Sequence, residues 1–470
     1  MRNRGREKMQ RAWRYVDAHF ETMIGDLQEV CRHPSMRGNP EGLEATRACI
    51  AAKMRQIGLS PARCDVPGGN AILHAAADGA CGETVLFYNH YDVVLPGESA
   101  SWSTGDPFEP AIVDGRLIAR GVSDDKGPLY SRLHAVEALL AAGEGLPAGV
   151  KFLVEGDEES GSHSLHRFAE ENAKTFREVT RADACVWENG RIDAAGRPWL
   201  RMGVRGSVGF DLVVTTAKKD VHGRMGATIP SASWRLVWAL STLKGPDEKV
   251  AIRGFYDRVL PASAEDLEVL REFPYEEEGQ KARLGIDAYL DGATGESLKR
   301  RAYLEPSVSI CALDAGEPHF GVRGIVPHTA RARVSFYLVA DQRPQEIRRL
   351  LRAHLDAHGF ADVEIVGGEN AHNRPVRTPV GTPFRARAIA AAKHVYEKPM
   401  VTELTQLGAG PACLFRDAWP EMPIVGFGPG NTNGNHHAPD ENLVVEDYRS
   451  AVKYVIALLC SYDNDGKEAA

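Results

Sequence analysis

The sequence has no closely spaced pair of cysteines. Its eight cysteines are scattered, at positions 31, 49, 64, 81, 185, 311, 413 and 460, and none forms a CxxC motif. This spacing signals neither a thiolate zinc site nor a redox motif. A disulfide framework is not expected, and a reducing compartment fits the pattern.

Long apolar runs and blocks of one charge are also lacking. No run approaches the length of about 18 apolar residues that a membrane span needs, and the basic start MRNRGREKMQRAW lacks the apolar stretch of a secretory signal. The formal net charge is -8, with both signs interspersed, whereas nucleic-acid binders usually show a basic face. We therefore expect a soluble cytoplasmic protein that binds neither nucleic acid nor membrane and has no charged docking tail.

The length and composition favour two domains. The chain has 470 residues, 43% of them hydrophobic, which is enough for a sizeable core and long for one domain. After an amphipathic helix at 9–31, strand-like runs alternate with helical stretches up to about residue 205. The clearest are strands at 84–90, 150–156 and 183–188 and a helix at 129–143. This alternation predicts an α/β fold, a largely parallel sheet with helices on both faces.

The hydrophobic pattern of the sequence changes near residue 206. The segments 207–217 and 330–340 partly alternate, as half-buried antiparallel strands do, and an amphipathic helix is predicted at 345–359. We therefore predict that 206–372 is an inserted α+β domain. Residues 1–205 and 373–470 then form one discontinuous domain, whose last part holds a helix, a short strand and a closing helix at 382–396, 423–428 and 445–461.

Four carboxylates crowd into the segment LVEGDEESGS at 153–162, directly after a predicted buried strand. Like charges this close repel one another, and cations among them would make the cluster stable. Five places in all put metal-compatible side chains after a predicted strand: His90 and Asp92, Asp124 and Asp125, Glu158 and Glu159, Glu188, and His436 and His437. Ligands bind at the carboxyl ends of strands in open α/β sheets, where loops can bring such groups together.

Imidazoles and carboxylates suit divalent ions such as Zn²⁺ or Mn²⁺. Taken singly, each of these groups is more often solvated than ligating, and the Asp124–Asp125 pair also fits a turn or a helix N-cap. Four other histidines lie in ordinary helix or loop contexts: His134, His163, His372 and His394. Five sites in chain order, each after a strand and each bounded by glycine, favour a metal centre.

These motifs resemble those of the M20 family of dinuclear zinc metallopeptidases, which includes carboxypeptidases, aminoacylases, desuccinylases and carnosinase-like dipeptidases. NHYDVV resembles the family's His-x-Asp motif, and WSTGDPFEP followed by GRLIARGVSDDKGP resembles the dipeptidase-type signature at a bridging aspartate. EGDEESGS resembles its Glu-Glu motif, and HHAPDEN its terminal His-x-x-x-Glu. The resemblance runs from the first helix to the last and is weakest in the inserted domain.

The resemblance implies a centre of two Zn²⁺ ions, with Mn²⁺ or Co²⁺ as alternatives, bridged by Asp124. The remaining ligands would be His90 and Glu188 at one ion, and Glu159 and His437 at the other. Family members often have a cis peptide after the bridging aspartate, which here is the Asp124–Asp125 bond. The domain formed by 1–205 and 373–470 would be the catalytic one.

The resemblance also implies roles in catalysis. Glu158 would be the general base that takes a proton from the attacking water, and Asp92 would hold the His90 ring. The segment KKDVHGRMGA in the inserted domain makes His222 the candidate donor to the oxyanion, delivered across a homodimer. The inserted domain would then serve as lid and dimerisation domain.

The sequence departs from the family pattern where the substrate would bind. Relatives often carry an arginine that grips a substrate carboxylate at the position of Tyr337, and LGAGPA replaces their Gly-Gly-Ser-Ile-Pro-like loop. Glu188 is typical of the aminoacylase and carboxypeptidase branches, whereas the motifs at Asp124 and Glu158 look dipeptidase-like. The candidate substrate-binding residues are Tyr337, Arg323, Gly408 and Gly410, with Arg343 as a second cation that could replace the arginine.

Three readings follow from these residues. The leading one is a di-zinc hydrolase that cleaves an amide or peptide bond of a small substrate, such as a dipeptide or an N-acyl amino acid. The second is a specialised amidohydrolase on the same fold, acting on a non-peptide amide. The third is a catalytically silent binding protein, which the presence of the base at Glu158 disfavours because silent relatives should lose the base or a ligand.

Overall fold

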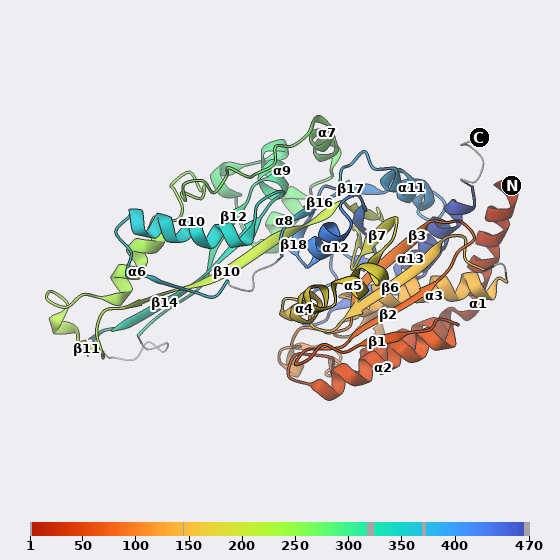
Figure 1. Cartoon of the computed structure of the whole chain (residues 1–470), viewed down its shortest axis with the longest axis horizontal. Helices are drawn as coiled ribbons and strands as arrows, with labels where there is room; N and C mark the ends of the chain where they lie inside the picture. The colour runs from red at the N-terminus through yellow and green to blue at the C-terminus, as the bar shows by residue number, and fades with distance from the viewer. Residues whose placement is uncertain (1, 144, 317–323, 369–372, 465–470) are drawn as a thin grey trace. The chain divides into compact units, whose positions relative to one another are not determined.

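The computed structural model describes residues 2–143, 145–316, 324–368 and 373–464 (Figure 1). The chain divides into two compact units, and each is described by itself. Residues 1–203, 378–404 and 414–470 form the first unit, and 204–377 and 405–413 form the second. The sequence predicted an insertion at 206–372, and residues 405–413 join the second unit in addition. None of the described helices combines the length and the apolar composition that a membrane span requires.

The first unit is built on an eight-stranded sheet with the order β1-β2-β6-β3-β7-β19-β9-β17. The strands are β1 Ala62–Cys64, β2 Ile72–Ala77, β3 Thr84–His90, β6 Gly149–Glu155, β7 Ala184–Trp187, β9 Trp199–Arg201, β17 Val401–Glu403 and β19 Ile424–Gly426. The neighbours β6, β3, β7 and β19 run parallel, and β2 lies antiparallel to β6. The four predicted strands of this unit are confirmed to within two residues at either end.

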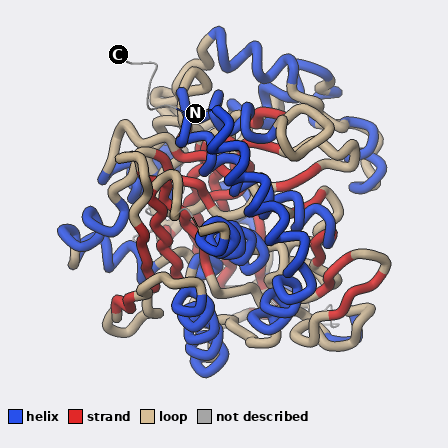
Figure 2. The backbone as a smooth tube through the Cα atoms, turned by 90° about the vertical axis from the view of Figure 1, so that its right-hand side faces the viewer, coloured by secondary structure: helices blue, strands red, loops and turns tan. Residues whose placement is uncertain are grey.

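Helices cover both faces of this sheet, as predicted. Alternate side chains of a strand point to opposite faces, and consecutive residues of β3 contact different helices. The guanidinium of Arg132, on α3, lies over the Phe87 ring, whereas the next residue, Tyr88, stacks on Trp187 and meets Phe415 of α12. Figure 2 shows long helices packed over the strands. The helices are α1 Arg2–Cys31, α2 Pro40–Gln56, α3 Lys126–Ala141, α4 His163–Glu171, α5 Ala173–Thr180, α11 Pro383–Ala392, α12 Ala412–Ala418 and α13 Val445–Cys460.

Three features of this unit differ from the prediction. The helix predicted at 9–31 begins earlier, at Arg2. The helix expected at 382–396 ends at Ala392, and the following residues form turns ahead of Pro399, which disfavours helix in the residue before it. The strand that precedes Asp124 is not part of the main sheet: β5 (Arg116–Ile118) pairs with β4 (Ala111–Val113) and β21 (Asn442–Val444) in a small separate sheet. Asp124 therefore comes from a loop between β5 and α3.

Short elements complete the first unit. β8 (Arg191–Ile192) and β20 (Gly430–Asn431) form a two-stranded ladder, and three turns are 3₁₀-helical: η1 Ser99–Ser101, η2 Glu158–Ser160 and η5 Ser461–Asn464. The turn η2 directly follows β6, so its three residues lie just beyond the carboxyl end of a central strand. It therefore brings the Glu-Glu pair to the edge of the main sheet.

The second unit is a mostly antiparallel sheet with helices on one face, in which β18 pairs parallel with β10. Its strands are β10 Gly203–Thr215, β12 Ser307–Ala315, β14 Thr329–Leu338, β15 Glu364–Val366, β16 Val376–Arg377 and β18 Gln406–Ala409, with β11 Val221–His222 and β13 Ile325–Val326 as a separate pair. Its helices are α6 Ala232–Ser241, α7 Ala264–Glu272, α8 Glu277–Leu284, α9 Gly295–Leu304 and α10 Pro344–Ala357, with 3₁₀ turns η3 Gly223–Met225 and η4 Leu290–Gly292. Inward residues of β10 and β14, such as Phe210 and Phe336, pack against α6 and α10 residues Leu236 and Leu351 in one core.

Candidate metal centre

The carboxyl edge of the main sheet gathers the predicted ligands. His90 is the last residue of β3 and lies in register with Glu155, the last residue of β6. Glu158 and Glu159 follow in η2, and Glu188 comes directly after β7. Because β6, β3 and β7 are parallel neighbours, these side chains emerge at the same edge.

Asp124 lies between two histidines. Its Oδ1 is 3.2 Å from His90 Nε2, and its Oδ2 is 3.4 Å from His437 Nε2. The same His437 nitrogen lies 3.0 Å from Glu159 Oε1. Ligand atoms of His90, Asp124 and Glu159 all lie within 4.8 Å of one another, and so do those of His90, Glu158 and Glu188. The two groups share His90, so the sheet edge holds two adjacent clusters of donors.

Burial and like charge dominate the electrostatics of these carboxyl groups. Burial raises the pKa of Glu158 well above its usual value, and the neighbouring Glu188 raises it further. Burial also raises the pKa of Glu188 to about 8, and its Oε2 is buried without a hydrogen-bond partner among the described residues. Carboxylates that resist ionising together are the groups that a divalent cation stabilises. The donor set therefore fits a metal centre.

The pKa of Asp124 is lowered, in contrast to those of Glu158 and Glu188, because two histidines contact its carboxylate. Burial alone would raise the pKa of its carboxyl, but hydrogen bonds from His437 and His90 lower it well below the usual range. In return, hydrogen bonds to Asp124 and Glu159 raise the pKa of His437 to about 10. The centre thus pairs imidazole nitrogens with carboxylate oxygens, the ligand types that suit zinc or manganese.

Asp92 supports two parts of the centre. Its carboxylate accepts the backbone N–H groups of Glu158 and Glu159, both at 3.1 Å, which fixes the turn η2. His90 Nδ1 lies 3.0 Å from the Asp92 carbonyl oxygen and 3.5 Å from its carboxylate. Asp92 therefore contacts the His90 imidazole with both its carbonyl oxygen and its carboxylate, and the carbonyl contact is the shorter of the two.

Glu441 organises the loop before Asp124, a role that the sequence did not reveal. Oε1 accepts the backbone N–H groups of Ser123 and Asp124 at 2.8 and 2.9 Å. Oε2 accepts the backbone N–H of Gly121 at 2.8 Å and the Nη1–H of the Arg120 side chain at 2.7 Å. The Glu441 side chain is buried. The only sequence signal was its spacing from His437. The Asp124–Asp125 peptide is cis, as the resemblance implied.

Arg132 and Asn189 are further supporting residues that sequence reasoning missed. The Arg132 guanidinium donates to main-chain oxygens of Tyr88, Trp187 and Glu188, and thereby ties β3 to β7 beneath the centre. Asn189 Nδ2 donates to Asp124 Oδ1 at 3.1 Å. A buried arginine inside a helical pattern gives no sequence signal, because its partners are set by tertiary packing.

The two adjacent histidines of HHAPDEN point to different partners. His437 contacts Asp124 and Glu159, whereas His436 Nε2 lies 2.7 Å from Ser123 Oγ. His436 therefore stands beside the loop that Glu441 holds. This geometry is consistent with the predicted choice of His437 as the ligand, which stays a prediction.

The other predicted site residues belong to the second unit. His222 is exposed on β11 and its Nδ1 accepts the backbone N–H of Arg224 at 3.2 Å. Tyr337 lies on β14 and is 40% exposed. Gly408 lies in β18 and Gly410 follows it, while Arg323 lies outside the described residues. Their roles toward a substrate stay predictions.

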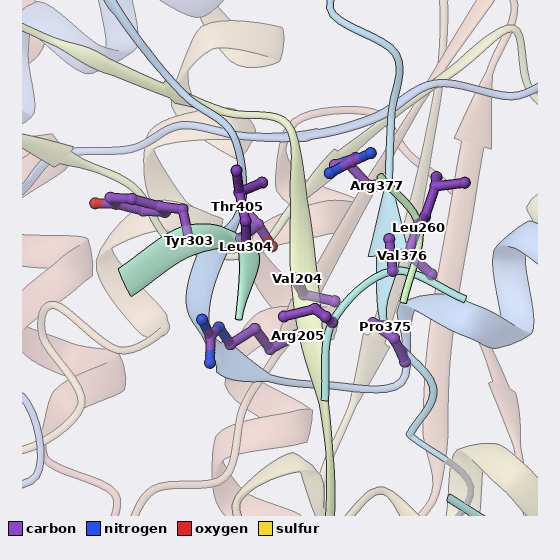
Figure 3. Close-up of a pocket in the computed structure, with 11 residues that line it drawn as sticks. Val204, Arg205, Leu260, Tyr303, Leu304, Pro375, Val376, Arg377 and Thr405 are labelled. Atoms are coloured by element: carbon purple, nitrogen blue, oxygen red, sulfur yellow. The ribbon is translucent and has the colours of Figure 1, made fainter. Parts of the chain in front are cut away.

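A cavity inside the second unit is too small for a substrate. Figure 3 shows Arg205, Leu260, Tyr303, Pro375 and Arg377 among the residues that line it. Its volume of about 10 Å³ holds one water molecule at most. Arg205 Nε is buried there without a hydrogen-bond partner among the described residues, while its Nη2 donates to the Ala302 and Glu305 carbonyls. We assign this cavity no ligand.

Comparisons with known proteins agree on one family. Residues 86–461 match the family described as peptidase family M20/M25/M40. Human Beta-Ala-His dipeptidase is 25% identical over 365 residues, which cover 74% of this chain and 71% of the relative. A cysteinylglycine-S-conjugate dipeptidase from Corynebacterium striatum is 24% identical over 435 residues, covering 90% of this chain and 91% of the relative.

A solved structure extends the likeness to the fold. The crystal structure of an M20 family metallo-carboxypeptidase from Sulfolobus solfataricus has a TM-score of 0.87 and 31% identity, covering 94% of this chain and 99% of that chain. The predicted α/β fold and the family resemblance are both confirmed. With a family match over most of its length and ligand clusters at the expected sheet edge, the chain belongs to the M20 peptidase family and is a metal-dependent hydrolase.

Proposed function

We propose that the protein hydrolyses the peptide bond of dipeptides or similarly small peptides, using two divalent ions bound at the carboxyl edge of the main sheet. The observation that carries this proposal is the position of Asp124, whose two carboxylate oxygens face two different histidines. A carboxylate placed in this way can bridge two cations. The names of the relatives, two dipeptidases and a carboxypeptidase, support a small peptide as substrate.

The residues would divide between two ions as the motifs predict. Asp124 would bridge them, with His90 and Glu188 at one ion and Glu159 and His437 at the other. Zn²⁺ is our first choice because the set combines imidazole and carboxylate ligands, and Mn²⁺ or Co²⁺ are alternatives. When bound, such a pair of ions polarises a carbonyl group and acidifies a water molecule.

Glu158 is the proposed general base. Its backbone N–H donates to Asp92 Oδ1 at 3.1 Å, which fixes the turn that carries the side chain. Glu158 would take the proton from the attacking water and deliver it to the leaving amine. Glu159, by contrast, already contacts His437 at 3.0 Å, which favours it as the ligand of the pair.

Metal removal tests this proposal. Dialysis against a chelator should abolish hydrolysis of a dipeptide panel, and adding Zn²⁺, Mn²⁺ or Co²⁺ should restore it. Elemental analysis of the active protein should give two ions per chain. Full activity of metal-free protein would refute the proposal.

A specialised amidohydrolase is the second candidate, because Tyr337 offers no cation at the position where relatives often carry an arginine. Its side chain is partly exposed on β14. The candidates differ in their response to a free-carboxylate dipeptide and its amide analogue. A dipeptidase that binds the carboxylate through a cation should lose about 10–150-fold in kcat/KM on the analogue. This factor corresponds to the free energy of a charge-assisted hydrogen bond, about 1.5–3 kcal/mol. A loss below about threefold would favour the amidohydrolase.

Assembly and location are proposals of the same kind. The described cysteines are all unpaired, which supports a reducing compartment such as the cytoplasm. The homodimer rests on the resemblance alone, with His222 as the residue that a second copy would deliver. Light scattering on the purified protein would test the dimer, and a monomer with full activity would contradict the role of His222 across an interface.

A further inference from the structure

A second, larger cavity lies in the first unit beside the turn that carries Glu158 and Glu159. Its volume is about 360 Å³, and its walls come from Arg37, from residues 68–70, and from Asp157, Ser160, His163, Ser164 and Arg167. Pockets of about 300–1,000 Å³ are typical of small-molecule sites. The space is therefore large enough for one amino-acid side chain or a small organic anion.

Strand pairing places this cavity next to the metal centre. β2 is antiparallel to β6, so the loop 68–70 before β2 meets the turn after β6 at the edge that also carries His90. Asn70 Nδ2 donates to the Gly156 carbonyl at 2.6 Å. Ser160, on the cavity wall, is the neighbour in sequence of Glu159, and consecutive Cα atoms lie about 3.8 Å apart. The turn η2 therefore contributes both to the proposed metal centre, through Glu159, and to the cavity wall, through Ser160.

The walls are held by hydrogen bonds. The backbone N–H and the hydroxyl of Ser164 donate to Asp157 Oδ2 at 2.9 and 2.8 Å, and the backbone N–H of Asn70 donates to Ser164 Oγ at 2.8 Å. A Cβ at Gly69 would come within 2.4 Å of Ser164 Oγ, so only glycine allows this approach of the loop to α4. The cavity is therefore bounded by fixed main chain.

The unpaired donors at the cavity are cationic or polar. Arg37 and His163 have no hydrogen-bond or ion-pair partner among the described residues. Arg167 is already paired with Glu171 and the Pro67 carbonyl. The one carboxylate on the wall is that of Asp157. Its Oδ2 accepts two hydrogen bonds from Ser164, and its Oδ1 is buried without a hydrogen-bond partner among the described residues. The surface that remains for a ligand presents the guanidinium of Arg37 and the imidazole of His163, and the unpaired oxygen of the one lining carboxylate is buried.

We propose that this cavity is a subsite for the carboxylate of an acidic residue of the peptide substrate, with Arg37 as its main donor and His163 as the second. A guanidinium fork matches a carboxylate in shape and charge. This inference rests on the proposed peptidase function, and it names acidic peptides as the preferred class. It also supplies, within the catalytic unit, a cation that the Tyr337 position lacks.

Paired peptides test the subsite. We compare kcat/KM for dipeptides that carry either Glu or Gln at the first or at the second position. Three proteins are tested: the native enzyme, Arg37→Gln and Arg55→Gln. Arg55 is exposed at the end of α2 and outside the cavity, so its variant is a control for net charge. The native enzyme and the control should prefer Glu by about tenfold or more at one position, and Arg37→Gln should reduce that ratio below about threefold. A ratio near one in the native enzyme, or a ratio that Arg37→Gln leaves unchanged, would overturn the proposal.

A binding measurement separates this proposal from the peptidase function. Calorimetric titration of glutarate into metal-free protein should show binding to the native chain and to Arg55→Gln, and binding at least about tenfold weaker to Arg37→Gln. If the metal-loaded enzyme cleaves no peptide, the peptidase function fails while the titration still tests the cavity. The enzyme could bind glutarate through Arg37 and still cleave peptides without a preference for acidic residues. That result would overturn the substrate assignment and leave a free anion as the ligand of the cavity. Equal glutarate affinity of the native chain and Arg37→Gln would show that the cavity is no carboxylate site.

Discussion

The Glu441 carboxylate accepts the backbone N–H of Asp124 at 2.9 Å. These residues are more than 300 positions apart in the chain, and the contact places a buried anion behind the aspartate that we propose as the bridge between two cations. Two more backbone N–H groups, of Gly121 and Ser123, point at the same carboxylate. The loop that carries Asp124 is therefore shaped around Glu441.

Glu441→Gln should weaken metal binding without removing a proposed ligand. The amide replaces one acceptor oxygen with an NH₂ group that would face backbone N–H donors, so the loop must shift. Loss of a residue that orients a metal ligand typically costs about 10–100-fold in metal affinity. Titration of the metal-free protein with Zn²⁺ would measure this. Glu446→Gln, at an exposed glutamate paired with Arg449, is the matched control and should bind metal as the native chain does.

Glu158→Gln should separate rate from metal content. The amide keeps the shape of the side chain but cannot accept the proton, so the rate should fall by about 10²–10⁴-fold while two ions remain bound. Glu159→Gln should instead lose an ion, because Glu159 contacts His437. Elemental analysis and kcat, measured on both variants, decide the assignment. Loss of metal from Glu158→Gln with retention in Glu159→Gln would reverse it.

His437→Ala should empty one metal position, and His436→Ala should keep both. The reason is geometric: His437 faces Asp124 and Glu159, while His436 faces the Ser123 hydroxyl. The two variants are matched, since each removes one imidazole from the same loop. Counting bound ions per chain is sufficient, and two ions in His437→Ala would contradict the assignment.

Local pattern was enough to predict the elements that carry the centre. β3 and β6 are short apolar runs that end at polar residues, so their ends and the candidate ligands after them could be read directly. The contacts that hold those ligands could not be read in this way. Arg132 looks like any polar residue within a predicted helix, yet it donates to main-chain carbonyls of β3 and β7.

Distance along the chain explains what the sequence did not reveal. The pairing of Glu441 with Asp124 and the cavity at Arg37 both depend on how loops far apart in sequence meet at one sheet edge. His163 is one of the four histidines in ordinary helix or loop contexts, and a histidine at a helix start has no pattern of its own. Only the meeting of loop 68–70 with α4 makes it part of a cavity wall.

Asp447 should make stability depend on pH at a position away from the proposed ligands. Burial raises the pKa of this carboxyl to about 6, with the Arg116 charge opposing the shift and the Glu446 charge adding to it. A carboxyl whose folded pKa lies above its unfolded value of about 4 stabilises the protein when protonated. That stability is fully present below pH 4, is lost as the pH rises from about 4 to 6, and stays lost above it.

Asp447→Asn removes the ionisation, so it should raise the melting temperature at pH 7.5 by about 1–3 °C and have little effect at pH 4. The gain should grow between pH 4 and 6, where the native carboxyl loses its proton. Thermal unfolding by circular dichroism across this range measures the difference between the two proteins. Asp78→Asn, at an exposed loop carboxylate, removes the same charge without burial and should show no such pH-dependent gain. An Asp447→Asn variant that is equally or less stable than the native chain at pH 7.5 would contradict the prediction, because the carboxylate would then be favoured in the folded state.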